Sequence, residues 1–160
     1  MPFAVFTLLD DKKVIQAMKP FFNIDFTKEL LEGGEKFVAG SVRQNIKSGK
    51  DVKGVAFQAL KESTVKAKKR KGSRQPKKPL VDTGTLRDQS IKAIEQKKNV
   101  VKVHVFNKKR IKIALIHNKG QGNMPQREFW GVADNNKDKV TRQVMNILRK
   151  KIVRLTGGGL

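Results

Sequence analysis

The sequence predicts an α+β fold, in which a small antiparallel β-sheet is flanked by a long N-terminal helix and a C-terminal helix. Three observations predict it. Apolar residues recur at helical spacing after Thr27 and again near the C-terminus, and two strand-like segments joined by a short polar turn lie between them. With 160 residues the chain fits one domain, 1–160. It has no cysteine, which excludes disulfides, thiolate metal sites and cysteine nucleophiles.

Residues 1–24 are predicted to form an apolar-rich N-terminal extension, in which Pro20 would stop or kink any helix begun around Lys12. The extension has no basic leader and no small-residue cleavage site, so we expect no signal peptide. No run of the sequence approaches the roughly 18 apolar residues that a membrane span needs. We therefore expect a soluble, intracellular protein with no membrane partner.

A helix is predicted over residues 28–47, with Thr27 as its cap. The Gly33-Gly34 pair weakens its first half, because glycine has a low helix propensity. Ser48 and Gly49 offer a stop. One face of this helix carries the residues that follow the i, i+3, i+4, i+7 spacing: Leu30, Leu31, Phe37, Val38, Ser41, Val42 and Asn45.

A second helix is predicted over Val55 to Lys69, with Val55, Ala59 and Leu60 turned inward. The segment 66–79 that overlaps its end has no acidic residue, repels itself and cannot bury apolar area, so it is predicted to be an exposed, flexible loop. It is either a solvated linker or a docking segment for an acidic partner or DNA phosphates. Its basic side chains are Lys66, Lys68, Lys69, Arg70, Lys71, Arg74, Lys77 and Lys78.

The two predicted strands are Ser90 to Glu95 and Val100 to Phe106, joined by the short polar turn QKKN as an antiparallel hairpin. Ile111 to Ile116 is a further apolar segment. The last helix is expected to begin near Asp134 or Asn135, and residues 156–160 to form a frayed tail. Its apolar face consists of Val140, Val144, Ile147, Leu148, Ile152 and Leu155.

The chain is strongly basic, with 36 Lys and Arg against 14 Asp and Glu and a net charge of +22. Such a charge favours either acidic partner proteins or nucleic acid, including non-specific contact with DNA at low salt. There is no Tyr and one Trp, and most Phe residues stand in apolar runs, so a base-stacking surface is not evident.

Catalytic and metal-binding patterns are missing. The two histidines, His104 and His117, have no HxH, HExxH or carboxylate cluster beside them, and no phosphate-binding glycine motif occurs. The D-T-G at Asp82 lacks the context of an aspartic protease, since T-L-R-D follows it. We expect no enzyme, no metal and no cofactor. A small hydrolase using Asp82 or His117 remains the enzymatic alternative.

The residues of two motifs can be assigned structural roles that require no catalysis. In KKPLVDTGTLRDQS, residues 77–90, Asp82 or Thr83 can cap a short helical turn, Gly84 permits a tight approach, Leu86 points inward and Arg87 stays available.

In LIHNKGQGNMPQREFWG, residues 115–131, the apolar Ile113 to Ile116 should be buried, and His117 should cap or hydrogen-bond at the boundary. Gly120 allows a turn, Pro125 restarts an extended chain and Arg127 is expected to face out. The aromatic pair Phe129-Trp130 should fill the core or an interface.

In this order and spacing, LVDTGTLRDQSI, the apolar segment ending in IHNKGQG, and MPQREFWGVADNNKDKV resemble the phage virion morphogenesis family of Mu-like and P2-like tailed phages. The resemblance covers roughly residues 54–150. The chain departs from the family's P-A-R-P-F-L-G at Gln126, Glu128 and Trp130, and it lacks the tyrosine that usually precedes the Ile-His pair.

The resemblance implies a structural tail-completion or neck protein that forms a homo-oligomeric ring, commonly a hexamer, at the head–tail junction of the virion, after assembly in the host cytoplasm. Its partners would be the adjacent neck, connector and tail proteins. The residues that match the family are Asp82, Gly84, Leu86, Arg87, His117, Gly120, Pro125, Arg127 and Phe129. Trp130 is a further candidate for the interface.

Overall fold

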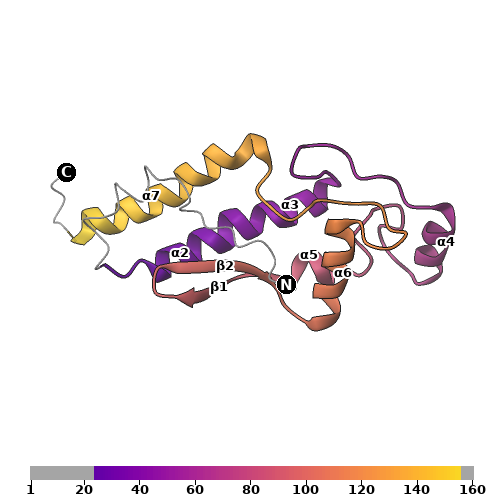
Figure 1. Cartoon of the computed structure of the whole chain (residues 1–160), viewed down its shortest axis with the longest axis horizontal. Helices are drawn as coiled ribbons and strands as arrows, with labels where there is room; N and C mark the ends of the chain where they lie inside the picture. Colours follow the sequence, from indigo (N-terminus) through magenta and orange to yellow (C-terminus); the bar gives the residue numbers. More distant parts are fainter. Residues whose placement is uncertain (1–23, 156–160) are drawn as a thin grey trace.

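The computed structural model describes residues 24–155 (Figure 1). The expectations for the extension 1–24, except at Ile24, and for the tail 156–160 lie outside the described residues. The described chain has the predicted α+β class: a two-stranded antiparallel sheet, a long N-terminal helix and a long C-terminal helix. In Figure 1 the N-terminal helix lies between the C-terminal helix and the β-hairpin, and the shorter helices lie toward the C-terminal end of the N-terminal helix.

The predicted N-terminal helix is confirmed as one continuous helical rod made of α2 (Thr27–Gly33), a π-helical segment η2 (Gly34–Ala39) and α3 (Gly40–Ser48). It ends at Gly49, which adopts a left-handed conformation with φ of 74°. Thr27 does not cap it. Thr27 is buried in the first turn, where its Oγ1 accepts a hydrogen bond from the Asn99 backbone at 3.0 Å, and the Asp25 carboxylate accepts from the Thr27 backbone at 2.8 Å.

The Gly33-Gly34 pair is where this rod packs most closely on both sides. A Cβ atom on Gly33 would lie 3.2 Å from Val144 in the C-terminal helix. A Cβ on Gly34 would lie 3.2 Å from Val101 and 3.3 Å from Ala93 in the hairpin. The lower helix propensity of the two glycines is therefore offset by the packing that they allow.

The predicted hairpin is confirmed as β1 (Ile91–Lys97) and β2 (Val100–Val105), paired antiparallel with Ile91 opposite Val105 and a bulge between Glu95 and Lys97. Its turn is tied to the start of the long helix. The Asn99 side chain accepts a hydrogen bond from the Phe26 backbone at 2.6 Å and donates one to the Ile24 carbonyl at 2.8 Å.

The second predicted helix is wrong at its start, because α4 spans only Glu62–Arg70. The Asp51 carboxylate accepts hydrogen bonds from the backbones of Lys53 and Val55, so a local turn satisfies the polar groups that a helix would use. Val55 is 61% exposed and Ala59 is exposed, contrary to the inward orientation predicted for both.

The apolar segment 111–116 belongs to α6 (Lys108–Lys119), whose first turn is capped by Asn107: the side chain accepts a hydrogen bond from the Lys109 backbone at 3.0 Å. Ala114 is its fully buried residue. The neighbouring Ile113 is exposed, so the prediction that it would be buried is wrong.

The C-terminal helix begins where predicted, with a 3-10 turn η3 (Asp134–Asn136) followed by α7 (Lys137–Leu155). Four of the six residues predicted for its apolar face are buried; Ile147 is only half-buried and Leu155 is exposed. The buried four repeat every four residues and pack against α2: Val140, Val144, Leu148 and Ile152. No helix within residues 24–155 combines the length and the apolar character needed to cross a membrane.

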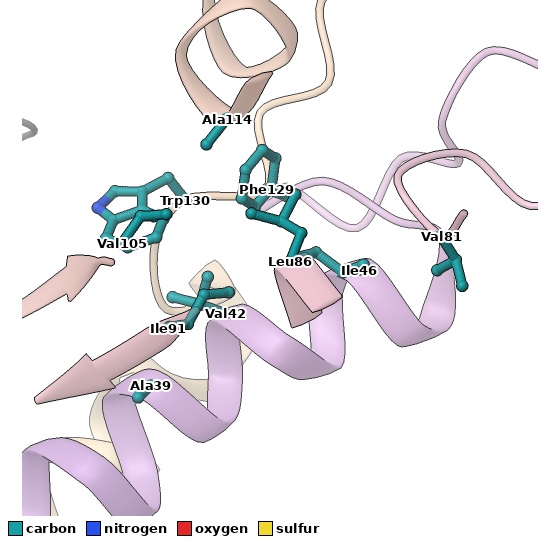
Figure 2. Close-up of a cluster of buried hydrophobic side chains, with 10 residues drawn as sticks. All are labelled: Ala39, Val42, Ile46, Val81, Leu86, Ile91, Val105, Ala114, Phe129 and Trp130. Carbon is teal, nitrogen blue, oxygen red and sulfur yellow. The ribbon is translucent and has the colours of Figure 1, made fainter. Parts of the chain in front are cut away.

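A second core cluster lies at the other end of the rod, where α3 meets the hairpin, α6 and the short helix α5 (Thr85–Asp88) (Figure 2). Phe129 is fully buried among Leu86, Ile46 and Ala114. This cluster fixes α5 and α6 relative to the rod, and these elements carry the two sequence motifs.

Candidate functional site

A pocket of about 610 Å³ is lined by residues of α4, α5 and α6. These helices lie toward the same end of the molecule in Figure 1. The walls of the pocket come from four separate parts of the chain: residues 58–68, 80–86, α6 and 123–127. Six of the residues that match the family line it and thereby join motifs that are distant in sequence: Asp82, Gly84, Leu86, His117, Pro125 and Arg127.

The D-T-G segment forms one rim of this pocket. Gly84 occupies the cap position of α5 with φ of 83°, a conformation that favours glycine. A Cβ there would lie 2.9 Å from an Asp88 carboxylate oxygen, so the exposed Asp88 side chain would have to shift. Of the two predicted caps, Thr83 acts weakly, since its Oγ1 accepts a hydrogen bond from the Thr85 backbone at 3.4 Å. The Asp82 side chain is exposed, and its backbone carbonyl accepts a hydrogen bond from Ser73 at 3.1 Å.

Arg87 lies outside the pocket lining and is not left available as predicted. Its guanidinium pairs with Asp88, with Nη2 2.7 Å from one carboxylate oxygen. The hydrogen bond raises the pKa of Arg87 and lowers the pKa of Asp88. Asp88 is exposed and Arg87 is half-buried at the surface, so the pair organises α5 locally and contributes little to stability.

Arg127 is the largest departure from the sequence interpretation, because it was expected to face out and is only 2% exposed. Its backbone N–H donates to the His117 carbonyl at 2.7 Å. In the side chain, Nη1 lies 3.2 Å from Nδ1 of His117, and Nη2 donates to the Gln58 carbonyl at 3.2 Å. Nε is buried without a hydrogen-bond partner.

His117 is paired with this guanidinium rather than with a carboxylate. Burial lowers the pKa of His117, and the positive charge of Arg127 lowers it further. The ring is therefore neutral at neutral pH, and its Nδ1 can accept the hydrogen bond from Arg127. Burial also lowers the pKa of Arg127, but an arginine guanidinium keeps its charge near neutral pH.

Gly120 shapes the turn that brings residue 127 back to residue 117. It ends α6 with φ of 63°, and a Cβ there would lie 2.9 Å from Cβ of Gln126 and 3.0 Å from its backbone nitrogen. The Asn118 side chain accepts a hydrogen bond from the Trp130 backbone at 3.0 Å. Gly120 thus positions the site without lining the pocket.

Phe129 and Trp130 pack in the core in this structure. They meet edge to face with ring centroids 6.2 Å apart, and Figure 2 shows them between α6 and the rod. The buried Asn45 donates hydrogen bonds to the carbonyls of Phe129 and Gly131, at 3.0 and 2.9 Å. The pair therefore anchors the segment that carries Arg127.

The basic segment 66–79 is not the uniformly exposed loop that was predicted. Residues 66–70 belong to α4, and Lys68 is only 9% exposed. Its ammonium group donates to the carbonyls of Gln75, Lys78 and Val81, which lie in irregular backbone. Burial lowers the pKa of Lys68. The exposed members of the set are Lys66, Lys69, Arg70, Lys71, Arg74 and Lys77.

Sequence reasoning missed Gln58 and Arg110 as pocket residues, and it placed Lys68 in the exposed basic loop without predicting its burial. Gln58 contributes a backbone carbonyl, which no side-chain pattern reveals. Lys68 stands among seven other basic residues that look alike in sequence, and Arg110 follows two lysines at the start of α6.

The described part of the chain, residues 24–155, contains no group of three histidine or carboxylate side chains that could hold a metal ion. A neutral histidine held by a buried arginine, without a carboxylate partner, lacks the arrangement of a general acid–base pair. The fold and site define a small α+β protein whose motif residues shape turns and line one pocket.

Comparison with known proteins agrees with the order of the motifs. The model of the phage virion morphogenesis family matches residues 28–149, which is most of the chain. The chain therefore belongs to the phage virion morphogenesis family, and its role lies in building a phage virion. No curated protein and no solved structure matches it.

Proposed function

We propose that the protein is a non-enzymatic tail-completion protein of the neck, which forms a ring, commonly sixfold, at the head–tail junction and joins tail to head. Its partners are further copies of the chain and the adjacent connector and tail proteins. Membership of the virion morphogenesis family supports the assembly role.

One observation carries the proposal: six of the nine residues that match the family line a single pocket, and none of the nine forms a reactive pair within the described residues. Gly84 and Gly120 set backbone turns, Phe129 fills the core, and Arg127 and His117 hold each other. Residues arranged in this way position a surface for another protein, as an assembly component requires.

The exposed basic residues of α4 and the following segment support docking on an acidic neighbour. Lys69, Arg70, Lys71 and Arg74 are exposed, and none of them takes part in an ion pair within the described residues. Like charges held together in this way attract an acidic surface strongly once it approaches.

The experiment that tests the proposal is quantitative mass spectrometry on purified particles, which counts this chain against the major capsid protein. A copy number on the order of six or twelve supports a ring at the neck or tail end. Absence from clean particles would contradict a resident neck protein.

Nucleic-acid binding is the second candidate, and the net charge of +22 favours it. A nucleic-acid-binding protein should show a linear fall of log affinity with log salt and keep a specific preference near physiological salt. A neck protein of this charge should bind DNA only weakly, and salt should abolish the binding.

A further inference from the structure

The side chain of Arg127 carries a buried positive charge whose contacts are all neutral. Its guanidinium hydrogen-bonds the His117 ring and the Gln58 carbonyl, and its Nε has no hydrogen-bond partner among the described residues. No ion pair among the described residues includes Arg127. A buried charge without a counter-ion is costly, and proteins keep one where a ligand supplies the opposite charge.

The pocket beside Arg127 also has an excess of positive charge. Its lining includes four basic residues, Lys61, Lys68, Arg110 and Arg127, against the single acidic Asp82. Asp82 is exposed and has no ion pair within the described residues. The hollow therefore attracts an anionic group.

Apolar side chains supply the rest of the wall. Ile113 on α6 and Met124 are exposed large apolar residues at the pocket, and the half-buried Leu60 and Leu80 also line it. Methionine adapts its shape to different apolar partners. A ligand that matches this lining carries an anionic group together with aliphatic side chains.

The geometry points to a recognition site for an acidic segment of a partner protein, in which a Glu or Asp carboxylate meets Arg127 and Arg110 while a neighbouring aliphatic side chain packs on Ile113 and Met124. Arginine suits this role because its planar donors match a carboxylate in pairs. This assignment rests on the proposed function for the source of the segment, an adjacent neck or tail protein.

Two other occupants fit less well. The pocket lining contains no aromatic residue other than the ring of His117, which is already engaged by Arg127, so nucleic-acid bases have no stacking surface. A second copy of this chain would bring another net charge of +22 toward a basic hollow. An acidic segment of a different protein needs no stacking surface and neutralises the positive charge of the pocket.

The test uses the purified full chain and two synthetic probes: an acetylated, amidated pentapeptide of alternating leucine and glutamate, and its leucine–glutamine counterpart. The chain has only two histidines, so the NMR signals of His117 report on the pocket and those of His104, which does not line it, serve as an internal reference. We expect the glutamate peptide to shift the His117 signals and to bind roughly tenfold or more tightly than the glutamine peptide.

A matched pair of variants locates the binding without touching the buried core. Arg110→Gln removes a partly exposed pocket charge, and Lys112→Gln removes one exposed charge on the same helix outside the lining. Arg110→Gln should weaken binding of the glutamate peptide severalfold, whereas Lys112→Gln should leave it nearly unchanged. The melting temperatures of both variants should stay close to that of the parent chain.

Several results would overturn the assignment. Equal affinity for the two peptides, or no binding of either, removes the role of the carboxylate. A DNA oligonucleotide that shifts His117 more strongly than the glutamate peptide makes nucleic acid the occupant, and a His117 shift that follows protein concentration alone makes it a second copy. The peptide measurement needs no virion. The count of copies in particles can therefore contradict the neck role while peptide binding still supports the pocket assignment.

Discussion

The ammonium group of Lys68 donates a hydrogen bond to the carbonyl oxygen of Val81, and this contact ties helix α4 to the segment that enters the D-T-G motif. The same ammonium donates to the carbonyl of Lys78 at 2.7 Å. One lysine thus holds the irregular backbone between α4 and α5 in place of regular secondary structure. The basic segment consequently contains one structural residue among exposed ones.

Replacement of Lys68 should therefore differ from replacement of its neighbours. Lys68→Ser leaves the carbonyls of Lys78 and Val81 without a donor and should lower the free energy of unfolding by about 2 kcal/mol. The triple variant of Lys69, Arg70 and Lys71 to Ser, all exposed, should change it by about 0.5 kcal/mol or less. Urea denaturation of both variants measures the difference, and equal losses would contradict the structural role of Lys68.

Gly34 and Gly40 lie in the same helical rod but should respond oppositely to alanine. A Cβ on Gly40 has no neighbour closer than 4.0 Å, so Gly40→Ala should stabilise by about 0.5–1 kcal/mol through helix propensity. A Cβ on Gly34 meets Val101 and Ala93 within 3.3 Å, and Gly34→Ala should destabilise by about 1 kcal/mol because the hairpin must move away.

Thermal unfolding of the two glycine variants provides the comparison, since each adds one methyl group to the same rod. If Gly34→Ala proved as stable as Gly40→Ala, the hairpin would yield without cost and the close approach would not explain the glycine.

Asn45 should be essential for stability even though it lies on a helix face that the sequence presents as apolar. Its side-chain amide donates to the buried carbonyls of Phe129 and Gly131. Asn45→Ala removes both hydrogen bonds and should cost about 2 kcal/mol or more, because the two carbonyls stay buried.

The adjacent Gln44 is exposed and provides the matched control. Gln44→Ala should change the free energy of unfolding by about 0.5 kcal/mol or less. A loss for Asn45→Ala as small as this would mean that water replaces the amide.

The long helices and the hairpin could be predicted because each presents a periodic apolar face that the rest of the chain buries. Val140 and Val144 on α7 are buried as their spacing indicates. The prediction fails at residues 55–61. The Asp51 carboxylate accepts a hydrogen bond from the Val55 backbone, and Ala56 and Phe57 pair back with Lys50 and Gly49, so no helix starts there. Side-chain competition of this kind is local, and a pattern of apolar residues does not record it.

The sequence predicted which residues belong to the candidate site, but it did not predict that they lie around one pocket. Asp82, His117 and Arg127 line one pocket because the core places α5 and α6 side by side, and no single motif contains that information. Arg127 was predicted to be exposed because charged residues seldom lie inside proteins. Its burial depends on a histidine ring and a backbone carbonyl supplied by distant segments.

The stability of the protein should depend on pH through His117. Burial and the charge of Arg127 hold the pKa of His117 below its ordinary value of 6.5, so the unfolded chain takes up a proton there before the folded chain does. A lowered histidine pKa therefore contributes stability that is complete above pH 6.5 and is lost progressively as the pH falls below that value. The lowered pKa of Asp88 acts only at more acidic pH, below its ordinary value of 3.8.

Unfolding by urea at pH 7.5 and pH 5.5 measures this dependence, and His117→Gln is the variant that tests its origin. Glutamine keeps a side-chain acceptor for Arg127 but does not titrate, so the variant should lose stability at pH 7.5 through poorer packing and lose less on going to pH 5.5 than the parent chain does. Gln44→Ala, which changes no titratable group, is the control and should keep the parent's pH dependence. If the parent and the His117→Gln variant lost stability equally between the two pH values, protonation of His117 would not be the cause, and the pairing of its ring with Arg127 would have to be reconsidered.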